Sequence, residues 1–368
     1  MHFALCTFHF FVVSENASLL LPKLLEMTAA RKASDLHLVT GRYPTLRIDG
    51  NLVPLVQEEI ITPQQTAALA HELMSEEQRK RFTAKGEIDF SYAFKEKARF
   101  RVNVYRERKF TAVAMRYVSA EIKPFAELNL PTSLEIFTRH SQGFLLLVGP
   151  TGHGKSTTLA AFLDIINHTR NVHILTIEDP IEYLFTPDRA IISQREVHED
   201  TESFNEALRY SFRQDPDVIM IGEMRDPETI ATAISAAETG HLVFATLHTN
   251  SAAQTLDRII DSFPGSQQNQ IRSQLASILL GVISQRLVPR IAGGRIPAVE
   301  LMIANHAIRN LIREGKTHQI DMVISTSSEQ GMIGLDRSLV NLLQRGEISV
   351  ETAQLYSLNQ PEMIKMLG

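Results

Sequence analysis

Residues 143–156 read GFLLLVGPTGHGKS, and this stretch decides the fold of the chain. Its first half, Gly143–Gly149, is a continuous apolar run of the kind that forms a strand buried on both faces. Its second half, Gly149–Ser156, fits the pattern G-x-x-x-x-G-K-[ST] at every fixed position, and a helical segment runs from Ser156 to Asn167. A buried strand, a glycine-rich loop and a helix in this order predict a phosphate-binding loop.

The residue types of this loop fit nucleotide chemistry. Glycines let backbone N–H groups turn inward around phosphates, and the following helix adds the positive end of its dipole. The ammonium group of Lys155 is expected to reach the β and γ phosphates, and the hydroxyl of Ser156 to hold Mg²⁺. We therefore predict ATP and Mg²⁺ as cofactors. The residues predicted to bind them are Gly149, Thr151, Gly152, His153, Gly154, Lys155, Ser156 and Thr157.

His153 is the unusual residue of the loop, because the motif requires no side chain at that position. Three interpretations of its imidazole are open: it contacts the nucleotide, it senses charge, or it faces water. Because the motif requires no particular side chain at this position, the interpretation that the ring faces water is favoured.

The sequence after the loop repeats the alternation of strand and helix. Val172–Ile177, Val218–Gly222 and His241–Thr246 are further apolar runs, and helical patterns separate them. This order predicts an α/β fold, in which a mainly parallel sheet is covered by helices. From about Ile271 the sequence is predicted to be mostly helical.

Acidic side chains follow two of the predicted strands. Glu223 ends the run Val218–Gly222, and in a phosphate-loop fold such an acid lies near Mg²⁺ and the γ-phosphate. We expect it to polarise the attacking water and to bind Mg²⁺ directly or through water; the alternative is a solvated carboxylate at an ordinary strand end. Glu178, Asp179 and Glu182 follow another strand. They are candidates to orient Mg²⁺, its waters or an arginine of a partner, or else cap a loop.

Two histidines bracket the predicted strand His241–Thr246. His241 and His248 are seven residues apart and therefore lie near opposite ends of the strand, a spacing that does not suit a shared metal ion. A polar residue at the end of this strand is placed to sense the γ-phosphate. The alternative for each histidine is a structural role.

The region before residue 119 has a different, α+β pattern. A helix is predicted over 19–30 and another from Thr62–Pro63, with Thr62 as N-cap. Alternating apolar residues predict strands within 34–55 and over Ile88–Phe94, Phe100–Tyr105 and Thr111–Tyr117. The predicted organisation is an extension over 1–18, a small domain over 19–118, a linker over 119–131 and an ATPase domain over 132–368.

The extension contains the apolar run Phe3–Val13, which is too short to span a bilayer as a helix, since a span takes about 20 residues. It is interpreted as a frayed extension or a start codon placed too early, with a targeting role as the alternative.

The 368 residues bear 37 basic and 42 acidic side chains, a net charge of −5, which argues against a nucleic-acid partner. The composition, 44% hydrophobic and 21% charged, excludes a disordered chain, a collagen-like chain and a membrane channel. Cys6 alone forms no internal disulfide and no multi-cysteine zinc site, which suits a reducing, cytosolic compartment.

A basic cluster lies at the end of the small domain. It includes Arg99, Arg101 and Arg116, and alternation along the strand places the first two on one face. Its possible roles are a solvated face, a nucleic-acid surface, or an arginine supplied in trans to an ATP site of a neighbouring subunit. We predict the last role for Arg101 and Arg116.

Several long strings together resemble the secretion-ATPase superfamily and, within it, the PilT-like retraction ATPases of type IV pili. The strings are SDLHL, RFRVN, GPTGHGKSTT, TIEDPIE, QREV, DPDVIMIGEMRD, ETGHLVFATLHTN, LDRIID and AIRNLIRE. The last of them, Ala307–Glu314, looks like the retraction-type C-terminal signature. Assembly ATPases usually carry a longer N-terminus and a multi-cysteine zinc motif, which this sequence lacks.

The resemblance implies a RecA-like ATPase core, a smaller PAS-like N-terminal domain and a helical C-terminal tail. Glu182 matches the functional carboxylate of the acidic box and Glu223 the catalytic glutamate, while His241 and His248 match the histidine box that couples nucleotide state to subunit contacts. The family usually has a small polar residue at the position of His153, so the effect of an imidazole on nucleotide affinity is open.

The resemblance also implies a partner set. Members form cytoplasmic homohexameric rings in which the PAS-like domain packs on the neighbour's ATPase domain. They dock peripherally at the inner membrane beneath a pilus platform protein, remove pilin from the filament base and power twitching motility. A second retraction ATPase is a further partner. The rival interpretations are an accessory PilU-like ATPase, a pilus assembly or type II secretion ATPase, and a nucleotide-binding scaffold with negligible turnover.

Overall fold

The chain divides into two compact units, Met1–Glu121 and Ile122–Gly368. The computed structural model describes residues 19–48, 50–94, 98–118 and 121–367. The predicted extension over 1–18 lies outside these ranges.

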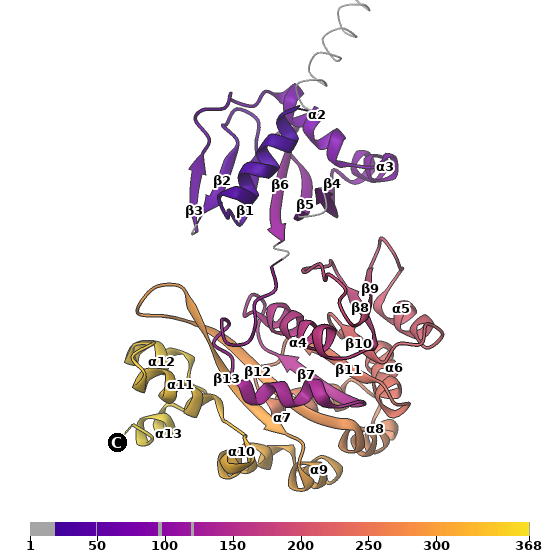
Figure 1. The fold of residues 1–368 in the computed structure, drawn as a ribbon, viewed down its shortest axis with the longest axis vertical. Helices are drawn as coiled ribbons and strands as arrows, with labels where there is room; N and C mark the ends of the chain where they lie inside the picture. The colour runs from indigo at the N-terminus through magenta and orange to yellow at the C-terminus, as the bar shows by residue number, and fades with distance from the viewer. Residues whose placement is uncertain (1–18, 49, 95–97, 119–120, 368) are drawn as a thin grey trace, which may run out of the picture. The chain divides into compact units, whose positions relative to one another are not determined.

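The N-terminal unit is built on a six-stranded antiparallel sheet with the order β3-β2-β1-β6-β5-β4 (Figure 1). Leucine, valine and phenylalanine side chains of one sheet face form its core with the helix over 19–30 and helix α2. Thr62 caps α2 in a reciprocal box with Gln65, and Pro63 is at the first helical position, as predicted. The elements are β1 (Asp35–Leu38), β2 (Thr45–Ile48), β3 (Asn51–Pro54), α2 (Pro63–Leu73), α3 (Glu76–Lys85), β4 (Glu87–Phe94), β5 (Ala98–Glu107) and β6 (Phe110–Val118).

The C-terminal unit contains a seven-stranded sheet with the order β13-β12-β7-β11-β10-β8-β9. All its strands are parallel except β13, which pairs antiparallel with β12 at one edge. The predicted mixed α/β fold is therefore confirmed. The strands are β7 (Gly143–Val148), β8 (His173–Glu178), β9 (Ile191–Glu196), β10 (Val218–Ile221), β11 (Leu242–Leu247), β12 (Leu279–Pro289) and β13 (Arg295–Ile303).

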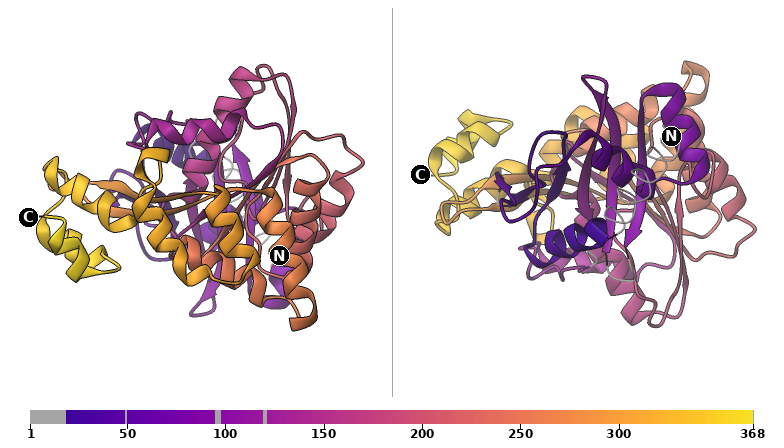
Figure 2. Two further views of the ribbon diagram at one scale, coloured as in Figure 1. Left: turned by 90° about the horizontal axis from the view of Figure 1, so that it is seen from below. Right: turned by 90° about the horizontal axis from the view of Figure 1, so that it is seen from above.

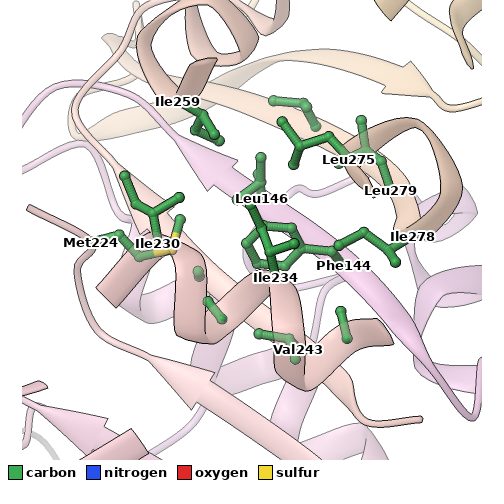
Figure 3. Close-up of a cluster of buried hydrophobic side chains, with 14 of the residues drawn as sticks. Phe144, Leu146, Met224, Ile230, Ile234, Val243, Ile259, Leu275, Ile278 and Leu279 are labelled. Atoms are coloured by element: carbon green, nitrogen blue, oxygen red, sulfur yellow. The ribbon is translucent and has the colours of Figure 1, made fainter. Parts of the chain in front are cut away.

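Helices cover both faces of this sheet, and β7 shows why its sequence is continuously apolar. Phe144 and Leu146 pack on one face, against residues of α6, α7 and α8 (Figure 3). Leu145 and Leu147 pack on the other face, in a cluster that contains residues of α4. The helices are α4 (Lys155–Thr169), α5 (Phe204–Ser211), α6 (Pro227–Glu238), α7 (Ala252–Asp261) and α8 (Gly265–Ile278), preceded by a 3₁₀ helix, η1 (Thr132–Arg139).

One feature differs from the sequence prediction of a mostly helical region after Ile271. Residues 279–303 form the hairpin β12–β13, and the helical tail begins only at His306. A short apolar run such as LLGVISQRLV suits a buried strand or a buried helix equally, so periodicity alone does not decide. Figure 2 shows α11–α13 gathered beside this hairpin. The tail comprises α9 (His306–Arg313), η2 (Thr317–Gln319), α10 (Ile320–Thr326), η3 (Ser328–Gln330), α11 (Leu335–Gln344), α12 (Val350–Tyr356) and α13 (Gln360–Lys365).

The string AIRNLIRE forms α9 and its end. Arg309 donates hydrogen bonds to four backbone carbonyls, those of Ala276, Ser277, Leu279 and Ala304, at the junction of α8 with β12. This arginine therefore satisfies carbonyl groups that the end of α8 leaves unpaired.

Within the described residues no helix is both long and apolar enough to cross a membrane.

Candidate active site

The predicted phosphate loop connects β7 to α4, and its lysine is buried. Lys155 is 8% exposed, and its Nζ donates to the carbonyls of Gly149 (2.7 Å) and Pro150 (3.0 Å). Burial lowers the pKa of Lys155, and the negative charges of Glu223 and Glu182 act against that shift. The hydrogen-bond partners that Nζ has within the described chain are neutral, so this buried ammonium fits an anionic ligand.

The predicted catalytic glutamate lies in the short connection between β10 and α6. Asp226 caps α6 by accepting from the backbone N–H of Thr229 at 2.7 Å, and Pro227 is the first helical residue. The cap fixes where the helix starts and leaves only residues 222–225 as the connection. Glu223 is thereby held at the edge of the sheet where β10 ends, with its side chain 20% exposed.

His248 joins this glutamate to the phosphate loop. Its Nε2 lies 3.0 Å from Oε1 of Glu223, and its Nδ1 lies 3.3 Å from Oγ1 of Thr151 and 3.4 Å from Nζ of Lys155. A ring that carries its proton on Nε2 donates to Glu223, and the single lone pair of Nδ1 is then shared between Thr151 and Lys155 as donors. His248, which follows β11, thus contacts three other residues predicted from the sequence: Glu223 after β10, and Thr151 and Lys155 of the phosphate loop.

Arg225 is a member of this cluster that sequence reasoning missed. Its Nη2 lies 2.8 Å from Oε2 of Glu223, so both carboxylate oxygens have a partner. Burial raises the pKa of Glu223, but the hydrogen bonds from Arg225 and His248 and the positive charge of Arg225 outweigh burial, and the pKa is lowered. The signal for Arg225 was present, since it stands two residues after the glutamate in the string GEMRD.

The acidic segment after β8 is organised by a buried carboxylate. Glu178 accepts from the hydroxyl of Thr176 (2.7 Å), the backbone N–H of Glu182 (3.2 Å) and the amide of Gln194 (3.2 Å). Burial raises the pKa of Glu178 to about 7. Glu182 itself is exposed, and it acts electrostatically on the lysine of the loop. Glu178 therefore positions the residue that was predicted to be functional.

Thr157 was predicted to bind the nucleotide, and the structure gives its hydroxyl another partner. Its Oγ1 lies 2.8 Å from the hydroxyl of Tyr183, in the acidic segment. This contact ties the first turn of α4 to the connection that follows β8.

His241 lies at the other end of β11 from His248, as the spacing predicted. Its Nδ1 lies 2.9 Å from the carbonyl of Ala236, and its ring meets that of Phe212 edge-on at 5.7 Å. The structure therefore does not bring His241 to the Glu223 cluster. A role in hydrolysis for His241 stays a prediction.

The two predicted trans-acting arginines are cross-strand neighbours in the N-terminal sheet. A row on its exposed face runs Arg47, Asp35, Arg116 and Arg101, across β2, β1, β6 and β5. Asp35 forms an ion pair with Arg116 at 2.9 Å and lies 3.9 Å from Arg47. The row contains three arginines and one carboxylate, so it keeps a surplus of positive charge.

The donor set fits ATP with magnesium. Ser156 is half-buried in the first turn of α4 and directly follows Lys155 in the chain. A magnesium ion at such a site takes most of its ligands from phosphate oxygens and water, so one hydroxyl and a nearby carboxylate are enough protein ligands. Within the described residues no group of three or more His, Cys, Asp or Glu side chains forms a metal cluster.

Comparison with known proteins defines the class to which this fold and site belong. The family model described as type II/IV secretion system protein matches residues 14–294, and the chain belongs to this family. Within it, the chain is a PilT-like ATPase. It is 46% identical over 340 residues to the type IV pilus retraction ATPase PilT of Pseudomonas aeruginosa, which covers 90% of this chain and 96% of that protein.

Two further comparisons agree with that assignment. The crystal structure of the pilus retraction motor PilT with bound ADP has a TM-score of 0.88 and 47% identity, and the match covers 94% of this chain and 99% of that one. The type IV pilus ATPase PilU of Pseudomonas aeruginosa is 38% identical, over 94% of this chain and 91% of that protein. The resemblance inferred from the sequence strings is confirmed.

Proposed function

We propose that the chain is a homohexameric, Mg²⁺-dependent ATPase motor that powers type IV pilus retraction and twitching motility. In this proposal the C-terminal unit is a RecA-like ATPase domain and the N-terminal unit a PAS-like domain. The ring works in the cytoplasm, peripherally at the inner membrane, beneath the platform protein of the pilus. The observation that carries the proposal is the contact of His248 with both Glu223 and the phosphate loop.

The proposed reaction is in-line attack of water on the γ-phosphate, which breaks the bond from the γ-phosphorus to the bridging oxygen and releases ADP and phosphate. The phosphates replace the two loop carbonyls as partners of Lys155 Nζ, so the buried ammonium gains a compensating negative charge. Glu223 orients the water and accepts its proton, for which its lowered pKa keeps it ionised at neutral pH. Ser156 and Glu223, the latter directly or through water, would hold Mg²⁺, which would neutralise charge on the phosphates.

His248 is proposed to report the state of the nucleotide. It lies between the carboxylate that faces the water and the lysine that faces the phosphates. Movement of either group on loss of the γ-phosphate changes its hydrogen bonds, and with them the loop after β11. This is a population shift between conformations that bind ATP and ADP differently.

The positive row on the N-terminal sheet is proposed to complete the site of a neighbouring subunit. Arg101 is exposed, whereas Arg116 is paired with the carboxylate of Asp35. An arginine that meets the developing phosphate charge in trans is worth roughly 10³–10⁵ in rate in enzymes of this type. Of the two, Arg101 is therefore the stronger candidate.

The first experiment is the steady-state Mg-ATPase rate per subunit, measured against protein concentration. We expect the rate per subunit to rise with protein concentration, since sites are completed across subunit borders. We expect Glu223→Ala to show no ATPase activity at any concentration. A rate of zero at every concentration, with ATP still bound, contradicts a self-sufficient motor. It favours either a scaffold or an accessory ATPase that needs a second motor.

The PilU-like accessory motor is the second candidate, and the 38% identity to PilU supports it. A cell that lacks the chain separates these alternatives and also tests the direction of movement. Pili that persist without twitching indicate a lost principal retraction motor. Near-normal twitching indicates an accessory role, and loss of pili indicates an assembly motor.

A further inference from the structure

Strand β12 lies directly against the phosphate loop. Its pairing with β7 ends at Ser284 and Val148, but β12 continues to Pro289. A Cβ atom on Gly149 would collide with the backbone carbonyl of Gln285, and one on Gly154 would lie 2.9 Å from the Gln285 amide nitrogen. The backbone of β12 therefore requires glycine at position 149, and a side chain at position 154 would have to displace the amide of Gln285.

The hairpin β12–β13 holds the loop by three hydrogen bonds. Two of them go to His153: the amide of Gln285 donates to its backbone carbonyl at 2.8 Å, and the backbone N–H of Leu287 donates to its ring Nδ1 at 3.0 Å. The third runs from Arg295 Nη1 to the carbonyl of Gly152 at 3.2 Å. His153 is therefore half-buried and fixed at both its main chain and its side chain, which corrects the favoured expectation that its ring faces water.

The bond from Leu287 requires a neutral imidazole. Nδ1 accepts a hydrogen bond only when it carries no proton, which places the ring proton on Nε2. The charged groups that face the ring are Arg286 from β12, Arg295 from β13 and Lys155 from α4, all cationic. Burial, and then these charges, lower the pKa of His153, so the accepting form prevails at neutral pH.

We propose that His153 is a positioning residue of the phosphate loop, which it anchors to the β12–β13 hairpin through Nδ1. The inference rests on the proposed function of this loop as the ATP site. A loop fixed before the ligand arrives loses less conformational freedom on binding, so the anchor raises nucleotide affinity. The anchor does not touch the Glu223 carboxylate, so it is expected to change KM and not kcat.

The hairpin also contacts helices α4 and α12, outside the phosphate loop. Gln285 accepts from the hydroxyl of Thr158 in α4 at 2.8 Å, and Arg286 donates to the carbonyl of Tyr356 in α12 at 3.0 Å. Through these contacts the position of the phosphate loop is connected to the C-terminal helices. His153 is the residue at which that connection begins on the loop.

The test uses the full-length chain with three variants and the affinity for ADP. His153→Ala removes the acceptor, while His153→Asn supplies an amide oxygen close to the place of Nδ1. We expect ADP binding and KM for ATP to weaken about five-fold in His153→Ala, the size of one net hydrogen bond, with kcat within about two-fold. His153→Asn is expected to restore most of the affinity. Lys155→Ala tests the site itself and is expected to abolish tight binding.

The outcomes separate the two proposals. If Lys155→Ala still binds ADP tightly, the proposed site is wrong. If Lys155→Ala loses binding but His153→Ala binds as wild type, or His153→Asn is as weak as His153→Ala, only the anchoring inference is wrong. Lowering the pH should weaken ADP binding more in the wild type than in His153→Asn, since only the imidazole takes up a proton at Nδ1; equal losses contradict the anchor.

A second measurement remains decisive if His153→Ala does not fold. The ¹⁵N chemical shifts of the His153 ring in the wild-type chain report which nitrogen bears the proton. An unprotonated Nδ1 at neutral pH is expected. A ring protonated at Nδ1 contradicts the proposal.

Discussion

The Nε2 atom of His248 lies 3.0 Å from Oε1 of Glu223, and this contact joins the ends of two neighbouring parallel strands. Because β10 and β11 pair in parallel, the residues that follow them emerge at the same edge of the sheet. The phosphate loop leaves β7 at that edge too, since β7 pairs in parallel with β11. The cluster is therefore a direct consequence of sheet topology, and each of its members is open to a separate test.

The first prediction concerns Glu223 as the general base. Glu223→Gln keeps the size of the side chain but cannot accept a proton, so kcat is expected to fall by about 10²–10⁴. Affinity for ATP should stay within a few-fold, because the lysine and the loop are intact. Steady-state turnover and equilibrium binding of ATP measure the two effects. Turnover close to the wild-type value would remove Glu223 from its assigned role.

The second prediction concerns Arg225, which the motif alone did not single out. Its hydrogen bond is one of the causes that lower the pKa of Glu223, so its removal is expected to raise that pKa. A base with a higher pKa becomes protonated at higher pH, and the acid limb of the kcat profile should move toward neutrality. Turnover of Arg225→Ala should therefore drop more steeply than wild type between about pH 8 and about pH 5.

Arg225→Lys is the matched control for that profile. It keeps a positive charge beside the carboxylate, so its acid limb should lie between those of the wild type and Arg225→Ala. If all three profiles coincide, the ion pair does not set the basicity of Glu223.

The residues of the site differ in how far sequence could predict them. Lys155, Ser156 and Glu223 follow from local patterns, since a strand, a loop and a helix are adjacent in the chain. Gln285 does not, because its partners in the loop and α4 are 132 and 127 positions away in the sequence. No local pattern records such a contact.

The same limit applies to the fold. The strand β7 was predictable because six consecutive buried residues leave no polar face. The hairpin β12–β13 was not, since its register depends on β7, a strand far away in the sequence. The edge strand β9 was also missed, because its half-buried residues show no apolar run.

The third prediction concerns sharing of sites between subunits. Arg101→Ala mixed with Lys155→Ala is expected to recover part of the ATPase activity, because some borders then combine an intact loop with an intact arginine. Arg116→Ala should behave likewise but be less stable, since it leaves the buried carboxylate of Asp35 with one fewer partner. Activity is measured across mixing ratios.

Arg81→Ala is the control for these mixtures. Arg81 is exposed on α3 and lies outside the positive row, so its substitution should leave the rate unchanged. If neither row variant regains activity in any mixture with Lys155→Ala, shared sites are not supported.

The fourth prediction concerns Glu300, a buried carboxylate beneath the connection that carries His248. Its Oε1 accepts from the backbone N–H of Ala252, the first residue of α7, at 2.8 Å, and on the facing strand Ser284 donates to the carbonyl of Asn250 at 2.9 Å. Burial raises the pKa of Glu300 from its ordinary value of 4.5 to about 7. The hairpin β12–β13 therefore holds the segment between β11 and α7, which carries His248, partly through a carboxyl group whose ionisation is disfavoured by burial.

The sign of the effect on stability follows from this shift. Between pH 4.5 and about 7 the unfolded chain releases the proton of Glu300 while the folded chain keeps it, so this residue makes stability decline as the pH rises. Glu300→Gln keeps an acceptor for the Ala252 N–H and cannot ionise. Its stability relative to wild type should therefore improve by about 2 kcal/mol from about pH 5 to about pH 8.5, a rise of roughly 4 °C or more in the relative unfolding midpoint. Glu329 is exposed in η3, and Glu329→Gln is the control that should show no such change. If the unfolding midpoint of Glu300→Gln changes with pH in the same way as that of the wild type, Glu300 is ionised at little cost in the folded chain.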